Sequence, residues 1–117
     1  MEMTLGEAQR LFTKLVAQLI TWTYSQPGLE LTFGEAYRTP EQAALNAKTG
    51  AGISNSLHTK RLAVDLQLFK DGIYQTDTDA YKPLGDYWTS LHELARWGGT
   101  FTHADGNHFS LTYGGVQ

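Results

Sequence analysis

The sequence predicts one α+β domain in which a small antiparallel sheet is flanked by helices. Its 117 residues match the usual size of a single domain. Stretches with apolar residues at helical spacing alternate with stretches of period two. These stretches follow the order helix, strand, helix, strands, helix, strand, which is typical of an antiparallel α+β fold. We therefore expect residues 1–117 to share one core.

The first helix is predicted over residues 4–24. Thr4 and Glu7 have the spacing of a capping box, in which the two side chains bond the first helical N–H groups. Apolar side chains then recur at helical spacing until Pro27-Gly28 ends the helix. We interpret this apolar stripe as the face that packs on the core, rather than a partner-binding or membrane-surface face.

The middle of the chain predicts a strand and a short helix. Residues 29–33 alternate with period two, as in a half-buried strand. Thr39 and Gln42 form a second capping box around a proline at the first helical position, which predicts a helix over 40–48. The Gly, Ser and Asn residues between 48 and 57 predict a loop.

The second half begins with a predicted hairpin. Residues 61–69 alternate again, and Asp71-Gly72 is a strong turn signal that joins this strand to 73–75. Apolar residues at mostly helical spacing predict a last helix over 79–97, ended by Gly98-Gly99. A closing strand is predicted from Phe101 onward, especially over 108–113.

Composition excludes several classes of protein. Nine basic residues and a net charge of −3 argue against a nucleic-acid-binding face. The absence of cysteine excludes disulfides and cysteine-type zinc sites. The most apolar stretch, 11–22, contains Lys14 and Gln18 and is too short to span a membrane. The N-terminus lacks the pattern of a secretory signal, so we expect synthesis in the cytoplasm without membrane insertion.

Two histidines have informative carboxylate neighbours. His58 precedes Asp65 by seven positions, and His108 follows Asp105 by three. Asp65 lies between apolar residues of a predicted strand, and a buried carboxylate needs a cation or several hydrogen bonds. Two imidazoles and a carboxylate are a ligand set of catalytic zinc sites, in which Asp105 would accept the proton of a water. The spacings also allow other interpretations: Asp65 pairs with Arg61 or Arg38, or His108 is a hydrogen-bonded core histidine.

Longer motifs resemble a known family. Residues 56–65, SLHTKRLAVD, resemble the S-x-H-x-x-G-x-A-x-D signature of the zinc peptidoglycan peptidases. This family includes the VanX/VanY-type D-Ala-D-Ala peptidases and the phage L-alanyl-D-glutamate endopeptidases. Residues 105–109, DGNHF, are similar to its second motif, and residues 36–42, AYRTPEQ, to its G-Y-R-S/T segment. Residues 97–99 resemble the turn before the second motif. The sequence departs from the family at Arg61 and Ala36, where glycine is usual.

The resemblance implies a hedgehog/DD-peptidase-like fold and a role for each matching residue. One Zn²⁺ per chain would be bound by His58, Asp65 and His108. Asp105 would act as the general base and then as the acid that protonates the leaving amine. Arg38 would help to stabilise the tetrahedral intermediate. The substrate-binding residues implied on the same basis are Arg38, Gln42 and Ser56.

The resemblance also indicates a branch of the family. An aspartate at position 105 resembles the phage endolysins, whereas the D-Ala-D-Ala peptidases typically carry glutamate there. We therefore expect a monomeric endopeptidase, without a separate wall-binding domain, that acts on peptidoglycan stem peptides of the cell wall after release from the host cytoplasm. The alternatives are a D-Ala-D-Ala carboxypeptidase and, in another class, a non-catalytic zinc-stabilised module of the hedgehog type. An iron oxygenase is disfavoured because its two histidines and carboxylate normally sit on jelly-roll strands, which the predicted order of helices and strands does not provide.

Four other side chains are interpreted as structural. His103 is expected in a solvent-facing loop, with substrate contact as the alternative. His92 is expected in the last helix, at the surface or in packing. Trp88 and Trp97 are expected in the core or cleft wall, with sugar stacking as the alternative.

Overall fold

The computed structural model describes residues 3–48 and 56–114. It confirms the α+β class predicted from the sequence. The elements are α1 (Leu5–Tyr24), β1 (Leu29–Phe33), α2 (Pro40–Lys48), η1 (Leu57–Lys60), β2 (Ala63–Lys70), β3 (Ile73–Tyr74), η2 (Thr78–Tyr81), α3 (Lys82–Leu91), β4 (Ala95–Trp97), η3 (Gly98–Thr100) and β5 (His108–Leu111), where η denotes a 3₁₀ turn. Most of the loop predicted between 48 and 57 lies outside the described residues.

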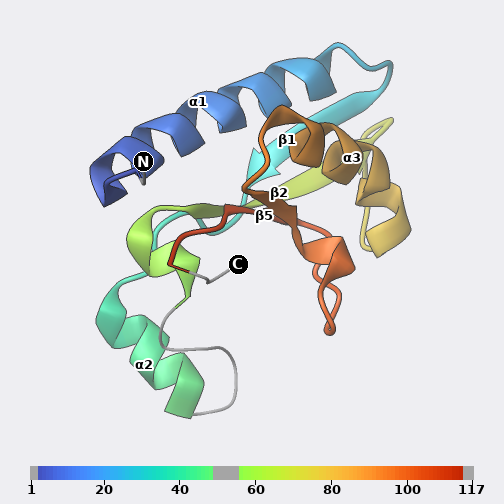
Figure 1. The fold of residues 1–117 in the computed structure, drawn as a ribbon. Helices are drawn as coiled ribbons and strands as arrows, with labels where there is room; N and C mark the ends of the chain where they lie inside the picture. The colour runs from blue at the N-terminus through green and yellow to red at the C-terminus, as the bar shows by residue number, and fades with distance from the viewer. Residues whose placement is uncertain (1–2, 49–55, 115–117) are drawn as a thin grey trace.

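The strands form one antiparallel sheet in the order β1-β2-β5-β4, and β3 pairs with the end of β2. In Figure 1, α1 and α3 lie next to each other across the strands, whereas α2 lies apart from them, at the other end of the molecule. β2 is the central strand, with β1 along one edge and both β5 and β3 along the other. Segments that follow β1 and precede β5 therefore meet at β2 from opposite sides.

The first two predicted helices are confirmed. In α1, Thr4 N donates to Glu7 at 2.9 Å and Glu7 N donates to Thr4 at 3.1 Å, so both halves of the capping box form. In α2, Gln42 N donates to the hydroxyl of Thr39 at 3.1 Å. The buried face of α1 consists of Ala8, Phe12, Leu15, Leu19 and Thr23.

The predicted hairpin also forms, with shifted ends. β2 begins at Ala63 rather than at Arg61, because Arg61 has left-handed backbone angles (φ 58°, ψ 36°) and ends η1. Asp71 and Gly72 have φ of 52° and 80°, as a two-residue hairpin turn of the favoured hand requires. The side chains of β2 alternate: Val64, Leu66 and Leu68 are buried, whereas Asp65 and Gln67 are partly exposed.

The predicted helix over 79–97 is wrong at its C-terminal end. α3 ends at Leu91, His92 is extended, and β4 pairs with β5 through Ala95↔Leu111 and Trp97↔Phe109. Ala95 and Trp97 are buried at alternate positions, as in a strand, but Ala95 also lies four positions after Leu91 and Trp97 three after Leu94, as in a helix. Residues 95–97 are a strand rather than a helix because they pair with β5. Gly98-Gly99 therefore follow a strand, and β5 is limited to four residues.

The core lies between α1, α3 and one face of the sheet. Trp88 is fully buried, and its ring meets Phe12 and Phe109 edge-on at centroid distances of 5.7 and 6.1 Å. Its indole N–H donates to the carbonyls of Arg96 and Ser110 at 3.0 and 3.1 Å. Trp88 is thus a core residue, and the opposite face of β2, with Asp65 and Gln67, is left for the site.

Close packing of Trp97 on α3 generates a prediction. A Cβ at Gly85 would overlap the buried Trp97 ring. Gly85→Ala should therefore lower the free energy of unfolding by about 1–3 kcal/mol, although alanine favours helix. Gly6→Ala is the control, because its Cβ would only touch the flexible end of Arg10 at 3.4 Å. Denaturant unfolding measures both, and equal stability of the two variants would contradict this packing.

Candidate metal centre and active site

The register between β2 and β5 places a carboxylate opposite an imidazole. Asp65 of β2 pairs directly with His108 of β5, so both side chains project from the same face of the sheet. Asp65 Oδ1 lies 3.5 Å from His108 Nδ1, and the Asp65 side chain is 20% exposed. Asp65 is thus partly buried, as its place between apolar neighbours predicted.

A 3₁₀ turn brings His58 to the same carboxylate. The hydroxyl of Ser56 caps this turn by accepting from His58 N at 3.2 Å, and Arg61 ends it. His58 Nδ1 lies 3.2 Å from the carbonyl oxygen of Ala36, which can only accept, so this nitrogen carries the hydrogen. The other nitrogen, Nε2, lies 3.5 Å from Asp65 Oδ1.

The donor atoms of His58, Asp65 and His108 fit a metal ion. They lie within 4.8 Å of one another. Asp65 Oδ1 is buried and has no hydrogen-bond partner among the described residues, and its 3.5 Å distances to the two imidazoles are long for hydrogen bonds. Ligand atoms about 2.1 Å from a tetrahedral ion lie about 3.4 Å apart. The cluster can therefore hold a cation such as Zn²⁺.

The charges in the cluster support one another. Burial acts to raise the pKa of Asp65, but the contacts with His108 and His58 outweigh it and lower the pKa to about 2. Burial likewise acts to lower the pKa of His58, but Asp65 and the Ala36 carbonyl leave it raised. Asp65 is therefore ionised at neutral pH, as a metal ligand must be.

Asp105 lies beside this cluster on the loop before β5. Its backbone N–H donates to Gly98 O at 2.9 Å, and its carbonyl accepts from His108 N at 3.1 Å. The Trp97 indole N–H donates to Gly106 O at 2.7 Å, so Trp97 belongs both to the core and to the support of this loop. Partial removal from water raises the pKa of Asp105, and the charge of Asp65 adds to the effect.

Residues 34–38 form the other side of the site. Gly34 N donates to Asp65 O at 2.7 Å, and Asp65 N donates to Glu35 O at 2.8 Å, so this segment runs along β2. Arg38 N donates to the carbonyl of His58 at 3.1 Å. Arg38 Nε donates to Glu35 Oε1 at 3.0 Å and Nη2 contacts the same oxygen, which raises the pKa of Arg38. Arg38 is thus held beside the cluster by Glu35.

The remaining residues singled out from the sequence lie as follows. Ser56 is buried and caps η1, whereas Gln42 is exposed and its amide donates to Asn46 at 2.7 Å. His103 is exposed in the loop before β5. His92, expected within a helix, instead follows α3, and its Nδ1 accepts from Leu94 N at 3.0 Å. The alternative pairing of Asp65 with Arg61 is not formed, because the Arg61 guanidinium lies over the Tyr37 ring, 4.1 Å from its centroid.

Comparison with known proteins identifies the family. A family model described as D-alanyl-D-alanine carboxypeptidase matches residues 49–111, which is more than half of the chain. The chain belongs to this family. It is therefore a peptidase, and the family predicted from the sequence motifs is confirmed. No curated protein sequence matches the chain.

Solved structures of this peptidase family share the fold. The L-Ala D-Glu endopeptidase ChiX of Serratia marcescens is 20% identical, with a TM-score of 0.73 over 86% of this chain and 77% of ChiX. The D,D-pentapeptidase VanY of a VanB-type resistance cassette, solved as a mutant in complex with Zn(II), is 19% identical, with a TM-score of 0.55 over 86% of this chain and 70% of VanY. At such identities the likeness concerns the fold alone.

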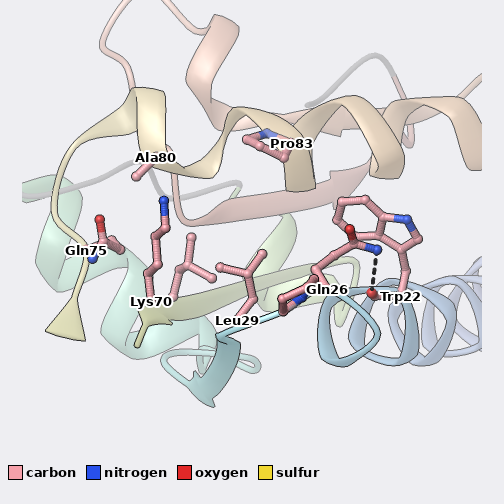
Figure 2. A pocket seen from close by; sticks show the side chains of 9 residues that line it. Trp22, Gln26, Leu29, Lys70, Gln75, Ala80 and Pro83 are labelled. Atoms are coloured by element: carbon pink, nitrogen blue, oxygen red, sulfur yellow. Dashed lines mark hydrogen bonds between the residues drawn. The ribbon is translucent and has the colours of Figure 1, made fainter. Parts of the chain in front are cut away.

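A cavity of about 390 Å³ lies away from the site of this peptidase (Figure 2). It is bordered by the end of α1, by β1 and β2, and by η2 and the start of α3. Figure 2 shows Lys70 extending from β2 toward Ala80. None of the candidate site residues lines it.

Among the described helices, none is long and apolar enough to cross a membrane.

Sequence reasoning missed two residues that build the site. Glu35 holds Arg38, and Gln67 lies two positions after Asp65 on the same face of β2. The period of two could have indicated Gln67, because every second residue of a strand shares a face. Glu35 carried no such signal, since its role depends on how the segment after β1 runs along β2.

The left-handed backbone of Arg61 generates a prediction. Glycine is favoured at φ 58°, and the signature that residues 56–65 resemble has glycine in this place. Arg61→Gly and Arg61→Ala both lose the contact with Tyr37, but only alanine keeps a Cβ. The glycine variant should therefore be more stable than the alanine variant by about 0.5–1 kcal/mol in thermal or denaturant unfolding. An alanine variant as stable as the glycine variant would show that this turn is not strained.

Proposed function

We propose that this chain is a zinc-dependent peptidase that hydrolyses the L-Ala–D-Glu bond of peptidoglycan stem peptides. The observation that carries the proposal is the cluster of His58, Asp65 and His108, with the carboxyl of Asp105 beside it. Two imidazoles and one carboxylate leave a fourth position open on a tetrahedral ion, as catalytic zinc sites do. A module that needs zinc only for structure has no use for a further carboxylate at that position.

Each residue has a role in this proposal. When bound, zinc supplies Lewis acidity and lowers the pKa of a water molecule. Asp105 accepts a proton from the attacking water and passes it to the nitrogen of the leaving amine. Arg38 stabilises the oxygen that gains negative charge. Its contacts with Glu35 use two of five N–H donors, so donors remain for a substrate oxygen.

Two lines of support favour the endopeptidase branch. The acid three positions before His108 is aspartate, as in the phage endolysins that the motifs resemble. The structure also has a higher TM-score against the L-Ala D-Glu endopeptidase ChiX than against VanY. The second candidate is a D-Ala-D-Ala carboxypeptidase, which the description of the matching family favours. Within the proposal, the protein is a monomeric phage lysis enzyme that acts on the bacterial cell wall.

Zinc binding can be measured directly. Purified protein should contain about one zinc ion per chain, and His58→Ala should lose it. His103→Ala is the matched control, because His103 is exposed and outside the cluster, and it should keep the metal. Removal of zinc by a chelator should lower the melting temperature, since only the folded chain gathers the ligands. Full zinc content in His58→Ala would contradict the ligand set.

Digestion of purified peptidoglycan tests the reaction. The zinc-loaded protein should release peptides with a new amino terminus on D-Glu, identified by mass spectrometry. Asp105→Asn should keep fold and zinc but lose at least about a hundredfold in rate, because an amide cannot carry the proton. Asp71→Asn, an exposed change in the hairpin turn, should retain full activity. Release of terminal D-Ala instead would move the protein to the carboxypeptidase branch, and no cleavage at all would refute the proposed function.

A further inference from the structure

A polar cavity of about 210 Å³ opens beside Asp105. It lies at the edge of β2 between β3 and β5, where the segment after β3 meets the loop before β5. Asp105 and Asn107 line it from one side, and Tyr74, Thr76 and Thr78 from the other. The roles proposed above for the metal ligands and for Arg38 do not use this cavity.

The walls of this cavity are held in place by hydrogen bonds to β2. The Asn107 amide and the Tyr74 hydroxyl both donate to Gln67 Oε1, each at 3.1 Å. The hydroxyl of Tyr81 accepts from Leu68 N at 3.0 Å and donates to Gln75 O at 2.8 Å. A Cβ at Gly106 would lie 2.9 Å from Thr78 Cα, so the two walls approach closely there. These hydrogen bonds therefore fix the positions of the residues that line the cavity.

The position of Asp105 determines which part of a substrate would enter. In the proposed reaction Asp105 gives its proton to the leaving nitrogen, so that nitrogen must lie next to Asp105. Arg38 lies on the opposite side of β2, on the segment that follows β1. A peptide that spans the site from Arg38 to Asp105 thus directs its leaving residue into the cavity.

The chemistry of the lining selects the kind of leaving residue. Hydroxyls and amides dominate it, and none of the lining residues, all within the described part of the chain, carries a positive charge. The one charged side chain is the carboxylate of Asp105. Such a cavity favours a neutral polar group, to which it offers hydrogen bonds. It disfavours a carboxylate, because it provides no positive charge, and an apolar group, because its own polar groups would then lack hydrogen-bond partners.

We infer that this cavity is the specificity subsite for the leaving residue, and that it receives a neutral, hydrogen-bonding side arm through Thr76, Thr78 and Asn107. The inference rests on the proposed function and deepens it. D-Glu inside a stem peptide has such an arm, because one of its carboxyls is amide-linked to the next residue. A terminal D-Ala offers a methyl side chain and a free carboxylate, for which the lining has no positive charge.

Three synthetic peptides that differ only in the leaving residue test the subsite. After an acylated L-Ala they carry D-Gln, D-norleucine or D-Glu, whose arms are similar in size but amide, apolar or anionic. The zinc-loaded wild-type protein should cleave the D-Gln peptide with a kcat/KM at least about tenfold above that of each of the others. Equal rates on the three peptides would overturn the subsite while leaving the proposed function intact.

Variants of the lining identify the residues responsible. Thr76→Val and Thr78→Val keep side-chain volume but remove a hydroxyl, and together they should reduce the preference for D-Gln over D-norleucine about tenfold. The double variant should cleave the D-norleucine peptide no more slowly than the wild-type protein does. Thr78→Ser in place of Thr78→Val should restore part of the preference for D-Gln, because serine returns a hydroxyl. Thr13→Val on α1 is the control, because its hydroxyl bonds only within its own helix, to Gln9 O. A uniform loss on all peptides would indicate a structural role and overturn the assignment.

A binding measurement separates failure of the subsite from failure of the proposed function. The leaving-side fragment, D-Gln amide with a free amino group, should perturb the amide NMR signals of Thr76, Thr78 and Asn107, and the Thr76→Val/Thr78→Val double variant should abolish this effect. If wild-type protein cleaves none of the peptides but still binds the fragment here, the proposed reaction is wrong and the cavity is a binding site for the polar arm, not a subsite of that reaction. Absence of binding here overturns the subsite.

Discussion

The site depends on one buried carboxylate that faces two imidazoles. Asp65 lies on the central strand, and its neighbours on three elements orient toward it: His108 through strand pairing, His58 through a capped turn, and residues 34–38 through backbone hydrogen bonds. Without a cation or proton, an acceptor oxygen and an imidazole lone pair at 3.5 Å repel each other. A cation bound between them removes this repulsion, so the strand pairing and the capped turn hold the three side chains at distances that favour a bound cation.

Sequence patterns predicted the fold where local signals and final packing agree. The capping box of α1, the Thr39 cap of α2, the alternation of β2 and the Asp71-Gly72 turn all involve neighbours in sequence, so their physics is visible without a structure. The helix predicted over 79–97 failed at Ala95 and Trp97, which fit a helix by their distance from Leu91 and Leu94 and a strand by their distance from each other. Only the long-range pairing with β5 distinguishes the two, and no local pattern carries it.

The site too was predictable where local motifs mark its residues, and not where long-range packing positions them. The motifs around His58 and His108 indicated which residues to examine, and the structure brings them together with Asp65. It also places Ser56 as a cap and leaves Gln42 exposed, so proximity to a motif did not fix the position of a side chain. Glu35 and Tyr74 belong to no motif, because their places follow from how the segment after β1 and strand β3 run along the edges of β2.

The three clustered side chains and the carboxyl proposed for proton transfer lie on different segments of the chain. Two of the three cluster residues belong to paired strands. Asp105 lies on a loop that is held by hydrogen bonds with Gly98 and Trp97. Changes to that loop can therefore remove or redirect the chemistry without dismantling the cluster. In a fold organised in this way, the carboxyl proposed for proton transfer can be lost while the three clustered side chains, and any cation they bind, stay in place.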